Sequence, residues 1–269
     1  MSVHPDGLSA AAIAFNRFGL GARPDEDAPR DPKAWLQGQF GRFQVRPEPL
    51  DRLSDPGEVV GKYRDRLKEM RRDARQSGAG GVDRKQVKSL RQDFAKDVQG
   101  LYRVAVNARV DSALSTEAPF VERLVHFWSN HFCVSADNPQ ITAFAAAFER
   151  DAIRPHVLGR FHDMLIAVEQ HPAMLIYLNQ ATSVGPNSRV AQRIEERNPR
   201  RKLGLNENLG RETMELHTLG VRSGYTQADV TEYSRALTGG TIGGFGPGPG
   251  GNGGNPDKFE FRPGLQEPG

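Results

Sequence analysis

The sequence predicts a mainly α-helical protein, an irregular multi-helix bundle with long polar and glycine-rich loops. Three observations support this class. Apolar residues recur three and four positions apart through most of the chain, which places them on one face of a helix. Capping residues precede these segments, and glycine or proline follows them. Hydrophobic residues make up 37% of the chain and charged residues 26%, a composition typical of soluble proteins with many solvated helix faces.

The first half of the chain predicts four helices. A short helix over residues 8–18 ends at Gly19, and Asp31 followed by proline opens the next one. A strongly charged helix spans residues 58–75, and small residues break it. A longer helix over residues 84–114 carries its apolar residues along one side: Val87, Leu90, Phe94, Val98, Leu101, Ala105 and Ala108.

Lysine and arginine are frequent in these charged helices, but they do not predict a nucleic-acid interface. Acidic residues alternate with them, and no aromatic platform or basic motif accompanies them. The formal net charge of the whole chain is only +3. We therefore expect a solvated helix pair and no nucleic-acid partner.

The chain also lacks the signals of a membrane or exported protein. No apolar run is long enough to cross a bilayer, so we expect no membrane partner. The apolar segment near the N-terminus has no basic residue before it, and Asn16 and Arg17 follow directly, unlike a signal peptide. A cytoplasmic location is the default expectation.

Residues 120–135, FVERLVHFWSNHFCVS, predict a helix with an aromatic and apolar face. His131 lies within that face, seven residues after Leu124, whereas His126 projects roughly opposite at about 100° per residue. The two histidines are therefore not expected to chelate one metal ion. Cys133, the single cysteine, excludes an intramolecular disulfide, and it is expected to be a buried, inert thiol because it follows Phe132 in an apolar run.

Three further helices are expected before a polar loop. They cover residues 140–154, 159–170 and 172–178, with Pro155 and Pro172 at the breaks. Their apolar residues predict core packing in preference to a cofactor site. Residues 182–202 predict a polar loop, which is either a mobile cover over a site or an insertion.

The clearest local signals lie in residues 203–240, LGLNENLGRETMELHTLGVRSGYTQADVTEYSRALTGG, which predict two consecutive helices. Asn206 is a good N-cap for the first helix, because its side-chain oxygen can accept from a free backbone N–H. Gly220 can take the left-handed conformation that ends this helix. Thr226 and Asp229 have capping-box spacing at the start of the second helix.

The first of these two helices places a carboxylate in its predicted buried stripe. The stripe consists of Leu205, Leu209, Glu212, Leu216 and Leu219. An ionised group taken out of water costs several kcal/mol unless a partner compensates. Two explanations stay open for Glu212: an internal arginine or histidine partner that serves structure, or a metal or acid–base site. His217 lies about 140° from Glu212 on the helix, so the two are not expected to share a ligand.

We expect one helical domain over residues 1–242 and a flexible tail over residues 243–269. The change follows from a dense glycine and proline tract, GGTIGGFGPGPGGNGGNPD, at residues 239–257. This tract follows a helix and lacks Gly-Lys-Ser/Thr, so neither a dinucleotide-binding fold nor a P-loop is supported.

Five blocks of sequence occur in a characteristic order: FNRFGLGARP, RLVHFWSNHFCVS, FERDAIRPHVLGRFHDMLIAVEQHPAMLIYLNQ, GLNENLGRETMELHTLGV and GYTQADVTEYSRALTGGTI. Together they resemble the bacterial family known as domain of unknown function 1800, over residues 12–242. The resemblance implies a helical protein with no established activity. Relatives usually continue beyond a segment like FEFRPGLQEPG and often have histidine where Gln266 stands here. The resemblance therefore implies a C-terminally truncated member, whose exposed apolar surface would invite a protein partner or self-association.

Within the shared blocks, the candidate catalytic residues are His131, Glu212 and Glu215. If the helix faces that carry His131 and Glu212 meet, each group offsets the burial of the other. In one hypothesis the chain is a helical protein with a structural His/Glu cluster that acts through a partner. In the other it is a metal-dependent or acid–base enzyme, such as a hydrolase, with His131 as base or metal ligand and the glutamates as co-ligands or orienting groups. No residue pattern identifies a cofactor, a metal, a substrate or a partner.

Overall fold

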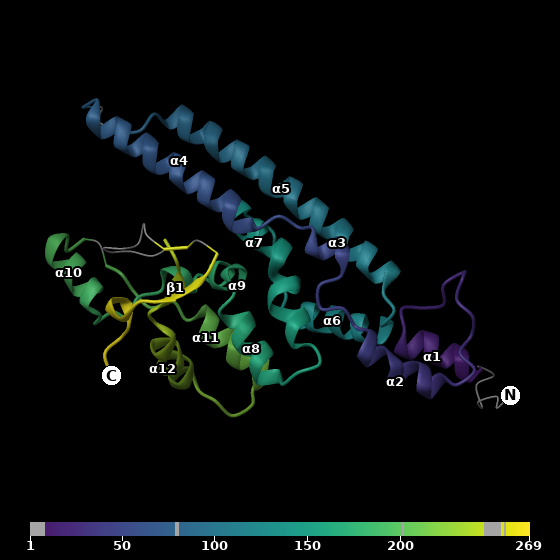
Figure 1. Ribbon diagram of the computed structural model, residues 1–269. Helices are drawn as coiled ribbons and strands as arrows, with labels where there is room; N and C mark the ends of the chain where they lie inside the picture. Colours follow the sequence, from purple (N-terminus) through teal and green to yellow (C-terminus); the bar gives the residue numbers. More distant parts are fainter. Residues whose placement is uncertain (1–8, 79–80, 201, 245–253, 256) are drawn as a thin grey trace.

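The computed structural model describes residues 9–78, 81–200, 202–244, 254–255 and 257–269 of the chain. These residues form a mainly helical structure with one two-stranded antiparallel sheet, so the predicted fold class is confirmed (Figure 1). The α-helices are α1 (Ala10–Phe18), α2 (Pro32–Arg42), α3 (Glu48–Asp51), α4 (Pro56–Gln76), α5 (Arg84–Ser115), α6 (Pro119–His131), α7 (Pro139–Phe148), α8 (Phe161–Glu169), α9 (Pro172–Tyr177), α10 (Arg189–Arg197), α11 (Asn208–Glu212) and α12 (Gln227–Leu237). The π-helical segments are η1 (Glu149–Ile153) and η4 (Thr213–Thr218), the 3₁₀ segments are η2 (Arg154–His156), η3 (Gln180–Thr182) and η5 (Pro263–Leu265), and the strands are β1 (Gly240–Ile242) and β2 (Phe259–Phe261).

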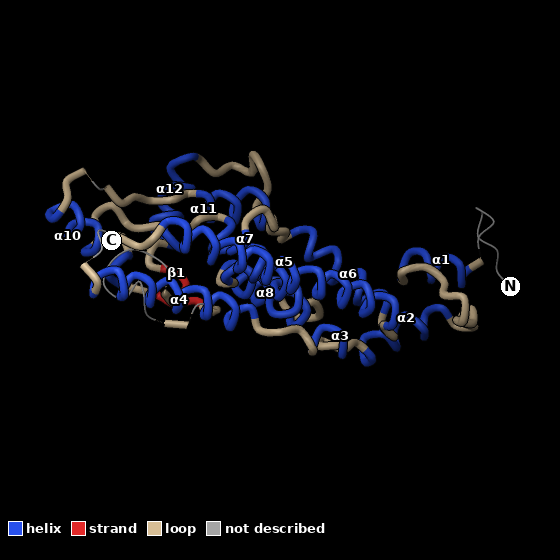
Figure 2. The backbone as a smooth tube through the Cα atoms, turned by 90° about the horizontal axis from the view of Figure 1, so that it is seen from above, coloured by secondary structure: helices blue, strands red, loops and turns tan. Residues whose placement is uncertain are grey.

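The elements are arranged along an elongated molecule. Helices α1 and α2 lie at one end and pack on α6, whereas α10, α12 and the small sheet lie toward the other end (Figures 1 and 2). Helices α4 and α5 run antiparallel as a long hairpin along one side (Figure 1). Among the described residues, no helix has both the length and the apolar character needed to cross a bilayer.

The α4–α5 hairpin corresponds to the two charged helices predicted from the sequence. Asp55 and Asp83 cap the two helices, and each carboxylate accepts from a backbone N–H of the first turn. The rings of Tyr63 and Phe94 stack with their centroids 4.3 Å apart, which joins the apolar faces of the two helices. Helix α5 also packs along α7, so the base of the hairpin is anchored in the body of the protein.

The main core gathers apolar side chains from α5, α6, α7, α8 and α9. Proline opens α6, α7 and α9, where the missing N–H would have no helical partner in any case. Phe132, Phe144 and Met174 are enclosed almost completely. Burial of each such side chain stabilises the fold by roughly 1.5–3 kcal/mol. This packing holds the helices that carry the polar clusters described below.

Two predicted helices widen into π-helical turns, because α7 continues into η1 and α11 continues into η4. In a π turn the hydrogen bond joins residue i to i+5, so successive side chains rotate by less than the 100° of an α-helix. The predicted buried stripe is therefore wrong beyond Leu209. Leu216 and Leu219 are 56% and 57% exposed, and Thr213 and His217 are buried instead.

Two of the three capping predictions for residues 203–240 are confirmed, whereas Asn206 lies one residue before the N-cap of α11, which is Glu207. The side-chain oxygen of Asn206 accepts from the backbone N–H of Asn208, the residue at which α11 begins. Gly220 has a φ of +90°, the left-handed conformation predicted for the end of this helix. Thr226 and Asp229 form the reciprocal hydrogen bonds of a capping box at the start of α12.

Two segments contain regular structure that the sequence did not predict. Helix α10, capped by Ser188, occupies the middle of the predicted polar loop. Strand β2 pairs with β1, and the buried Leu265 packs against Val184 and Ala191. The described residues 257–269 therefore lie against the helical part of the chain, where a flexible tail was expected. Residues 245–253 and 256 of that tail lie outside the described residues.

Candidate functional site

The three predicted site residues lie near one another in the chain fold but do not form one hydrogen-bonded cluster. His131 is half-buried at the end of α6, and its Nε2 lies 3.2 Å from the backbone carbonyl oxygen of His217. Glu212 is half-buried and has no hydrogen bond or ion pair within the described part of the chain. Glu215 forms a 3.6 Å ion pair with Arg211 of the preceding turn. The partner of His131 is thus the π-helical segment η4 at His217, and not a glutamate.

The closest His/Glu contact in this region joins His217 to Glu169 at the end of α8. Nδ1 of His217 lies 2.7 Å from Oε1 of Glu169, and only 6% and 14% of the two side chains are exposed. Because a carboxylate accepts, it favours the proton on Nδ1 and leaves the lone pair on Nε2. His131 donates from its own Nε2 to the His217 carbonyl oxygen, since a carbonyl only accepts. These two bonds join α6, α8 and η4.

A mostly apolar cavity of about 270 Å³ lies beside this contact. Its polar lining residues are Glu169, Gln170, Gln180, Thr213 and Tyr233. Burial raises the pKa of Tyr233, and the charge of Glu169 raises it further. Glu169 Oε2 and Gln180 Oε1 are buried without a hydrogen-bond partner in the described chain. This end of the molecule therefore has uncompensated acceptors close to an apolar space.

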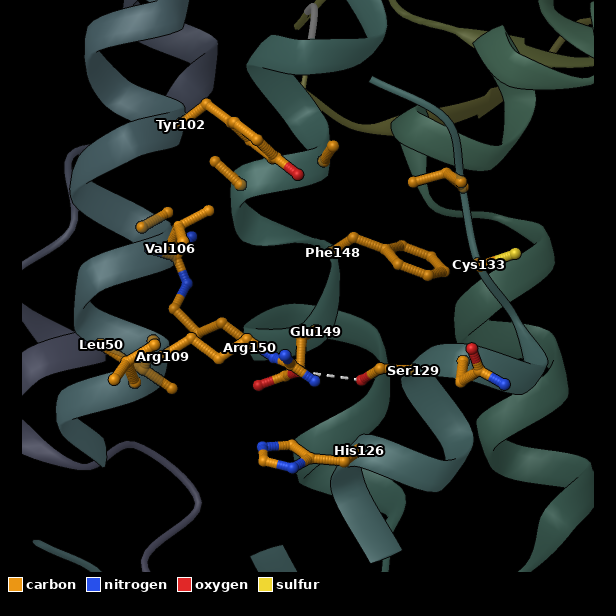
Figure 3. Close-up of a pocket in the computed structure, with 16 residues that line it drawn as sticks. Leu50, Tyr102, Val106, Arg109, His126, Ser129, Cys133, Phe148, Glu149 and Arg150 are labelled. Carbon is orange, nitrogen blue, oxygen red and sulfur yellow. Dashed lines mark hydrogen bonds and ion pairs between the residues drawn. The ribbon is translucent and has the colours of Figure 1, made fainter. Parts of the chain in front are cut away.

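A second polar cluster lines a cavity of about 340 Å³ between α5, α6 and α7 (Figure 3). Glu149 is central to it, because its Oε2 accepts from Nε of Arg109 at 2.6 Å and from Oγ of Ser129 at 2.9 Å. Apolar residues such as Val106 and Phe148 form much of the remaining wall. Figure 3 shows the charged side chains gathered around Glu149, with Phe148 and Val106 above them.

Behind this wall, Arg154 and Glu122 form a fully buried ion pair. Two nitrogens of Arg154 donate to the two carboxylate oxygens at 2.6 and 2.9 Å, and each side chain is only 1% exposed. Arg154 also donates to the backbone carbonyl oxygens of Gln44 and Val45, and its guanidinium lies 5.1 Å from the centroid of the Phe43 ring. The ion pair is bidentate, and the remaining guanidinium donors of Arg154 bind backbone oxygens. Together these bonds offset the free-energy cost of removing both charges from water.

His126 lies between the cavity and the buried ion pair. Its Nε2 is 3.8 Å from Oε1 of Glu122, which is too long for a hydrogen bond, and this nitrogen is buried without a partner in the described structure. Burial lowers the pKa of His126, and the charge of Arg109 lowers it further. The imidazole is therefore neutral near pH 7. The Glu122 charge favours the tautomer with the proton on Nε2, which leaves a lone pair on Nδ1.

Cys133 also lines the larger polar cavity and is exposed, so the predicted burial of this thiol is wrong. The prediction rested on the apolar run around Phe132, but helix α6 ends at His131, so Cys133 lies outside the helix and is exposed. Phe132, directly before it, does enter the core.

Within the described ranges, no three side chains of histidine, cysteine, aspartate or glutamate lie close enough to hold one metal ion. His126 and His131 belong to different clusters. The cluster at η4 contains His131 and His217, and the cluster beside α5 contains His126; the carboxylates in these clusters, Glu169 and Glu149, are already engaged by His217 and Arg109. A catalytic zinc site takes three protein ligands.

A family model described as protein of unknown function (DUF1800) matches residues 13–269. The chain belongs to this family. The resemblance seen in the five sequence blocks is thus confirmed, and the match extends through the glycine-rich region to β2 and the C-terminal residues. No curated protein and no solved structure matches the chain.

Proposed function

We propose that this chain is an acid–base enzyme of the hydrolytic type, with its site in the cavity between α5, α6 and α7. The proposal is carried by the convergence on one wall of a neutral imidazole, a guanidinium, a hydroxyl and a carboxylate, from His126, Arg109, Ser129 and Glu149. A general base must be unprotonated at the working pH and accessible to the proton that it removes. His126 meets the first condition through its lowered pKa, and the second is supported by its place in the cavity wall with 30% of its side chain exposed.

Ser129 and Glu149 act as positioning residues in this proposal. The Ser129 hydroxyl donates to Glu149, and no hydrogen bond to a histidine activates it as a nucleophile in the described structure. Glu149 in turn holds Nε of Arg109. The nucleophile is therefore a water molecule, from which His126 Nδ1 takes a proton as the new bond to carbon or phosphorus forms. The imidazolium then returns the proton to the leaving oxygen, so hydrolysis consumes one water and regenerates the base.

Arg109 supplies the electrostatic part of the reaction. Its side chain is 43% exposed, and its terminal nitrogens make no hydrogen bond with the described residues. They can therefore donate to the oxygen on which negative charge develops. The apolar remainder of the cavity suits a substrate with a small apolar body, and its volume lies near the lower end of the roughly 300–1,000 Å³ of small-molecule pockets.

A structural role is the second candidate function for the more deeply buried polar contacts. Arg154 and Glu122 are only 1% exposed, so a substrate would reach them only if the core opened. The pair links α6, η2 and the segment after α2 through hydrogen bonds. His217 and Glu169 link η4 to α8 in the same way. In this reading the His/Glu cluster specifies the packing of helices and takes no part in turnover.

Hydrolysis of p-nitrophenyl acetate and p-nitrophenyl phosphate between pH 5 and 9 tests the proposal. Wild type should show a rate that rises with pH through an apparent pKa below the ordinary value of about 6.5 and then reaches a plateau. His126→Gln should lower the plateau rate by roughly 10²–10⁴-fold. His162→Gln, an exposed histidine on α8, is the matched control and should leave the rate unchanged.

The structural alternative predicts a different pattern. Equal rates for wild type and His126→Gln, or a wild-type rate no higher than that of buffer on both probes, would overturn the catalytic role of His126. Unfolding midpoints of both variants are measured in parallel. They show whether a fall in rate comes from removal of the general base or from loss of the folded structure.

A further inference from the structure

The outer half of helix α4 has most of its basic residues on one side. Along α4 the acidic residues Asp65, Glu69 and Asp73 recur every four positions. The basic residues of the outer half are Lys68, Arg71, Arg72 and Arg75. At about 100° per residue, the centre of the basic row lies roughly 110° around the helix from the centre of the acidic row. Lys62 and Arg66 lie on the acidic side, and Arg66 pairs with Glu69 at 2.9 Å, so the charges of α4 are not fully separated. The four basic residues of the outer half are nevertheless grouped on one side.

The basic row of α4 surrounds a hollow in the surface of about 420 Å³. Its described lining residues are Lys68, Arg71, Arg72, Arg75 and Gln76, with no acidic side chain among them. Lys68 pairs with Asp65 at 3.1 Å. The three arginines make no ion pair with any residue that the structure describes. Three guanidinium groups therefore converge on one hollow without a counter-ion from the protein.

Helix α5 adds a second basic row on the same side of the hairpin. Arg84, Lys88 and Arg91 are spaced four and three residues apart, which places them on one helix face. The two helices are antiparallel and meet through Tyr63 and Phe94 (Figure 1). At 100° per residue, the basic row is rotated by about 130° from Tyr63 on α4 and by about 90° from Phe94 on α5, in the same sense along each chain. The sense of rotation reverses between antiparallel helices, so the two rows lie on one side of the pair.

The concentration of charge in this part of the hairpin exceeds that of the whole chain. Residues 68–91 contain eight lysines and arginines and three acidic residues, whereas the formal net charge of the full chain is +3. Like charges on neighbouring turns repel and destabilise a helix by a few tenths of a kcal/mol per pair. A bound polyanion would remove this repulsion.

We propose that this basic side of the hairpin, formed by Lys68, Arg71, Arg72, Arg75, Arg84, Lys88 and Arg91, binds the phosphate backbone of a nucleic acid. Arginine matches phosphate oxygens through its planar fork of donors. The row from Lys68 to Arg75 extends over about 10 Å of helix, which corresponds to about three phosphates of one strand. The expectation of no nucleic-acid partner rested on the interspersed acidic residues and on the lack of an aromatic platform or basic motif. The grouping of basic residues on this side of the hairpin answers the first ground, and contacts to a phosphate backbone need no aromatic platform.

A nucleic acid fits this surface better than an anionic membrane. Helices that bind lipid surfaces insert large apolar side chains below their basic residues. From residue 46 to residue 103, no large apolar side chain of the described chain is exposed. The apolar faces of α4 and α5 are occupied by their contact with each other and with α7. The exposed side of the hairpin therefore has basic side chains but no large apolar side chain that could insert into a lipid layer.

Fluorescence anisotropy with the full chain tests the proposal, using a labelled 30-base-pair DNA duplex and a labelled 30-nucleotide RNA at 50–200 mM KCl. Wild type should bind at least one of them with an affinity that falls steeply with salt. The variant Arg71→Gln/Arg72→Gln/Arg75→Gln should make the slope of log K against log[KCl] shallower by about 2–3 and weaken binding at least tenfold at 100 mM, since each phosphate contact contributes about 0.7–0.9 to the slope.

The matched control removes the same charge from another exposed helix, α10, through Arg189→Gln/Arg193→Gln/Arg197→Gln. It should bind as wild type does. No wild-type binding at 50 mM KCl, or an equal loss in both triple variants, would overturn the proposal. Retention on phosphatidylserine vesicles without binding to either nucleic acid would overturn it too and assign the surface to a membrane. Thermal unfolding of both variants should match wild type, because all six arginines are exposed.

Discussion

Replacement of Arg154 by methionine tests the buried ion pair directly. Arg154 donates two hydrogen bonds to Glu122 and two to backbone carbonyl oxygens, and both charged side chains are 1% exposed. Methionine keeps an unbranched apolar stem and fills much of the same space, but it removes every donor. Glu122 then remains as a buried carboxylate that lacks its arginine.

The expected loss of stability is large because the charge of Glu122 remains buried without its partner. Removal of one partner from a buried pair costs about 3–5 kcal/mol. In a chain of this size, each kcal/mol shifts Tm by roughly 2–4 °C, so Tm should fall by about 6–20 °C. Desolvation raises the pKa of a carboxyl group that has lost its partner. The folded variant therefore binds a proton more tightly than the unfolded chain does, and its stability deficit should be larger at pH 8 than at pH 5.

Urea unfolding at pH 8 and pH 5, followed by far-ultraviolet circular dichroism, measures this loss. The double variant Arg154→Met/Glu122→Leu should recover part of the stability, because it removes both charges together. Arg160→Met is the control, since Arg160 and Asp163 form an exposed ion pair. Hydrogen bonding to Arg160 lowers the pKa of Asp163 to about 2, yet solvent screening should leave Tm unchanged. The role assigned to the pair is refuted if Arg154→Met lowers the free energy of unfolding no more than Arg160→Met does. It is also refuted if the double variant is as unstable as Arg154→Met, because the buried Glu122 charge would then not be the cause of the loss.

Three other perturbations test separate parts of the structure. Burial lowers the pKa of His171 to about 4, so its contribution to stability is present above pH 6.5 and is lost as the pH falls toward 4. In His171→Asn a side-chain oxygen replaces the Nδ1 that accepts from the Ala173 N–H, so the cap has an acceptor without a titrating ring. This variant should flatten the pH dependence of urea unfolding in that range, and an unchanged slope would contradict the prediction. Thr226→Ala removes the hydroxyl of the capping box and should lower the free energy of unfolding by about 1 kcal/mol, measured by thermal unfolding. Thr226→Ser keeps a hydroxyl and should retain most of this free energy. Equal free energies of unfolding for Thr226→Ala and wild type would show that the cap contributes nothing. Glu267→Ala removes a carboxylate that accepts three hydrogen bonds, so amide exchange should quicken in residues 257–269 and stay constant in α7; unchanged exchange in that segment would refute its anchoring role.

The successful predictions from the sequence depend on contacts within a few residues. Prolines opened helices where a backbone N–H was dispensable, Gly220 took the left-handed conformation, and Thr226 capped α12. Each of these effects acts between residues no more than about four positions apart, so neighbouring residues suffice to determine it.

The failures arise where a regular period was extended too far. Leu216 and Leu219 were placed in the core by a constant 100° rotation, but the π turn of η4 changes that rotation and brings His217 inward. Cys133 was assigned to a helix that ends two residues before it. Packing against α6 and α8 accompanies the π turn, through the contacts of His217 with His131 and Glu169. A local pattern contains no information about such distant partners.

One signal for the larger polar cluster was present in the sequence. Glu122, His126 and Ser129 are spaced four and three residues apart, so they form a polar stripe on α6. A stripe of this kind inside an aromatic helix predicts polar partners from elsewhere in the fold. The partners themselves, Arg154 for Glu122 and Glu149 for Ser129, lie 32 and 20 residues away.

The sequence by itself determined the helical class, most helix ends and the family, because all of these depend on residue type and short spacing. Only the tertiary structure decided which charged groups meet. It pairs Arg154 with Glu122, Arg109 with Glu149 and His217 with Glu169, and it leaves Glu212 without a partner in the described chain. The physical reason is that a buried charge takes whichever opposite charge the packing of distant helices brings within hydrogen-bond distance, and that packing is set by the apolar core.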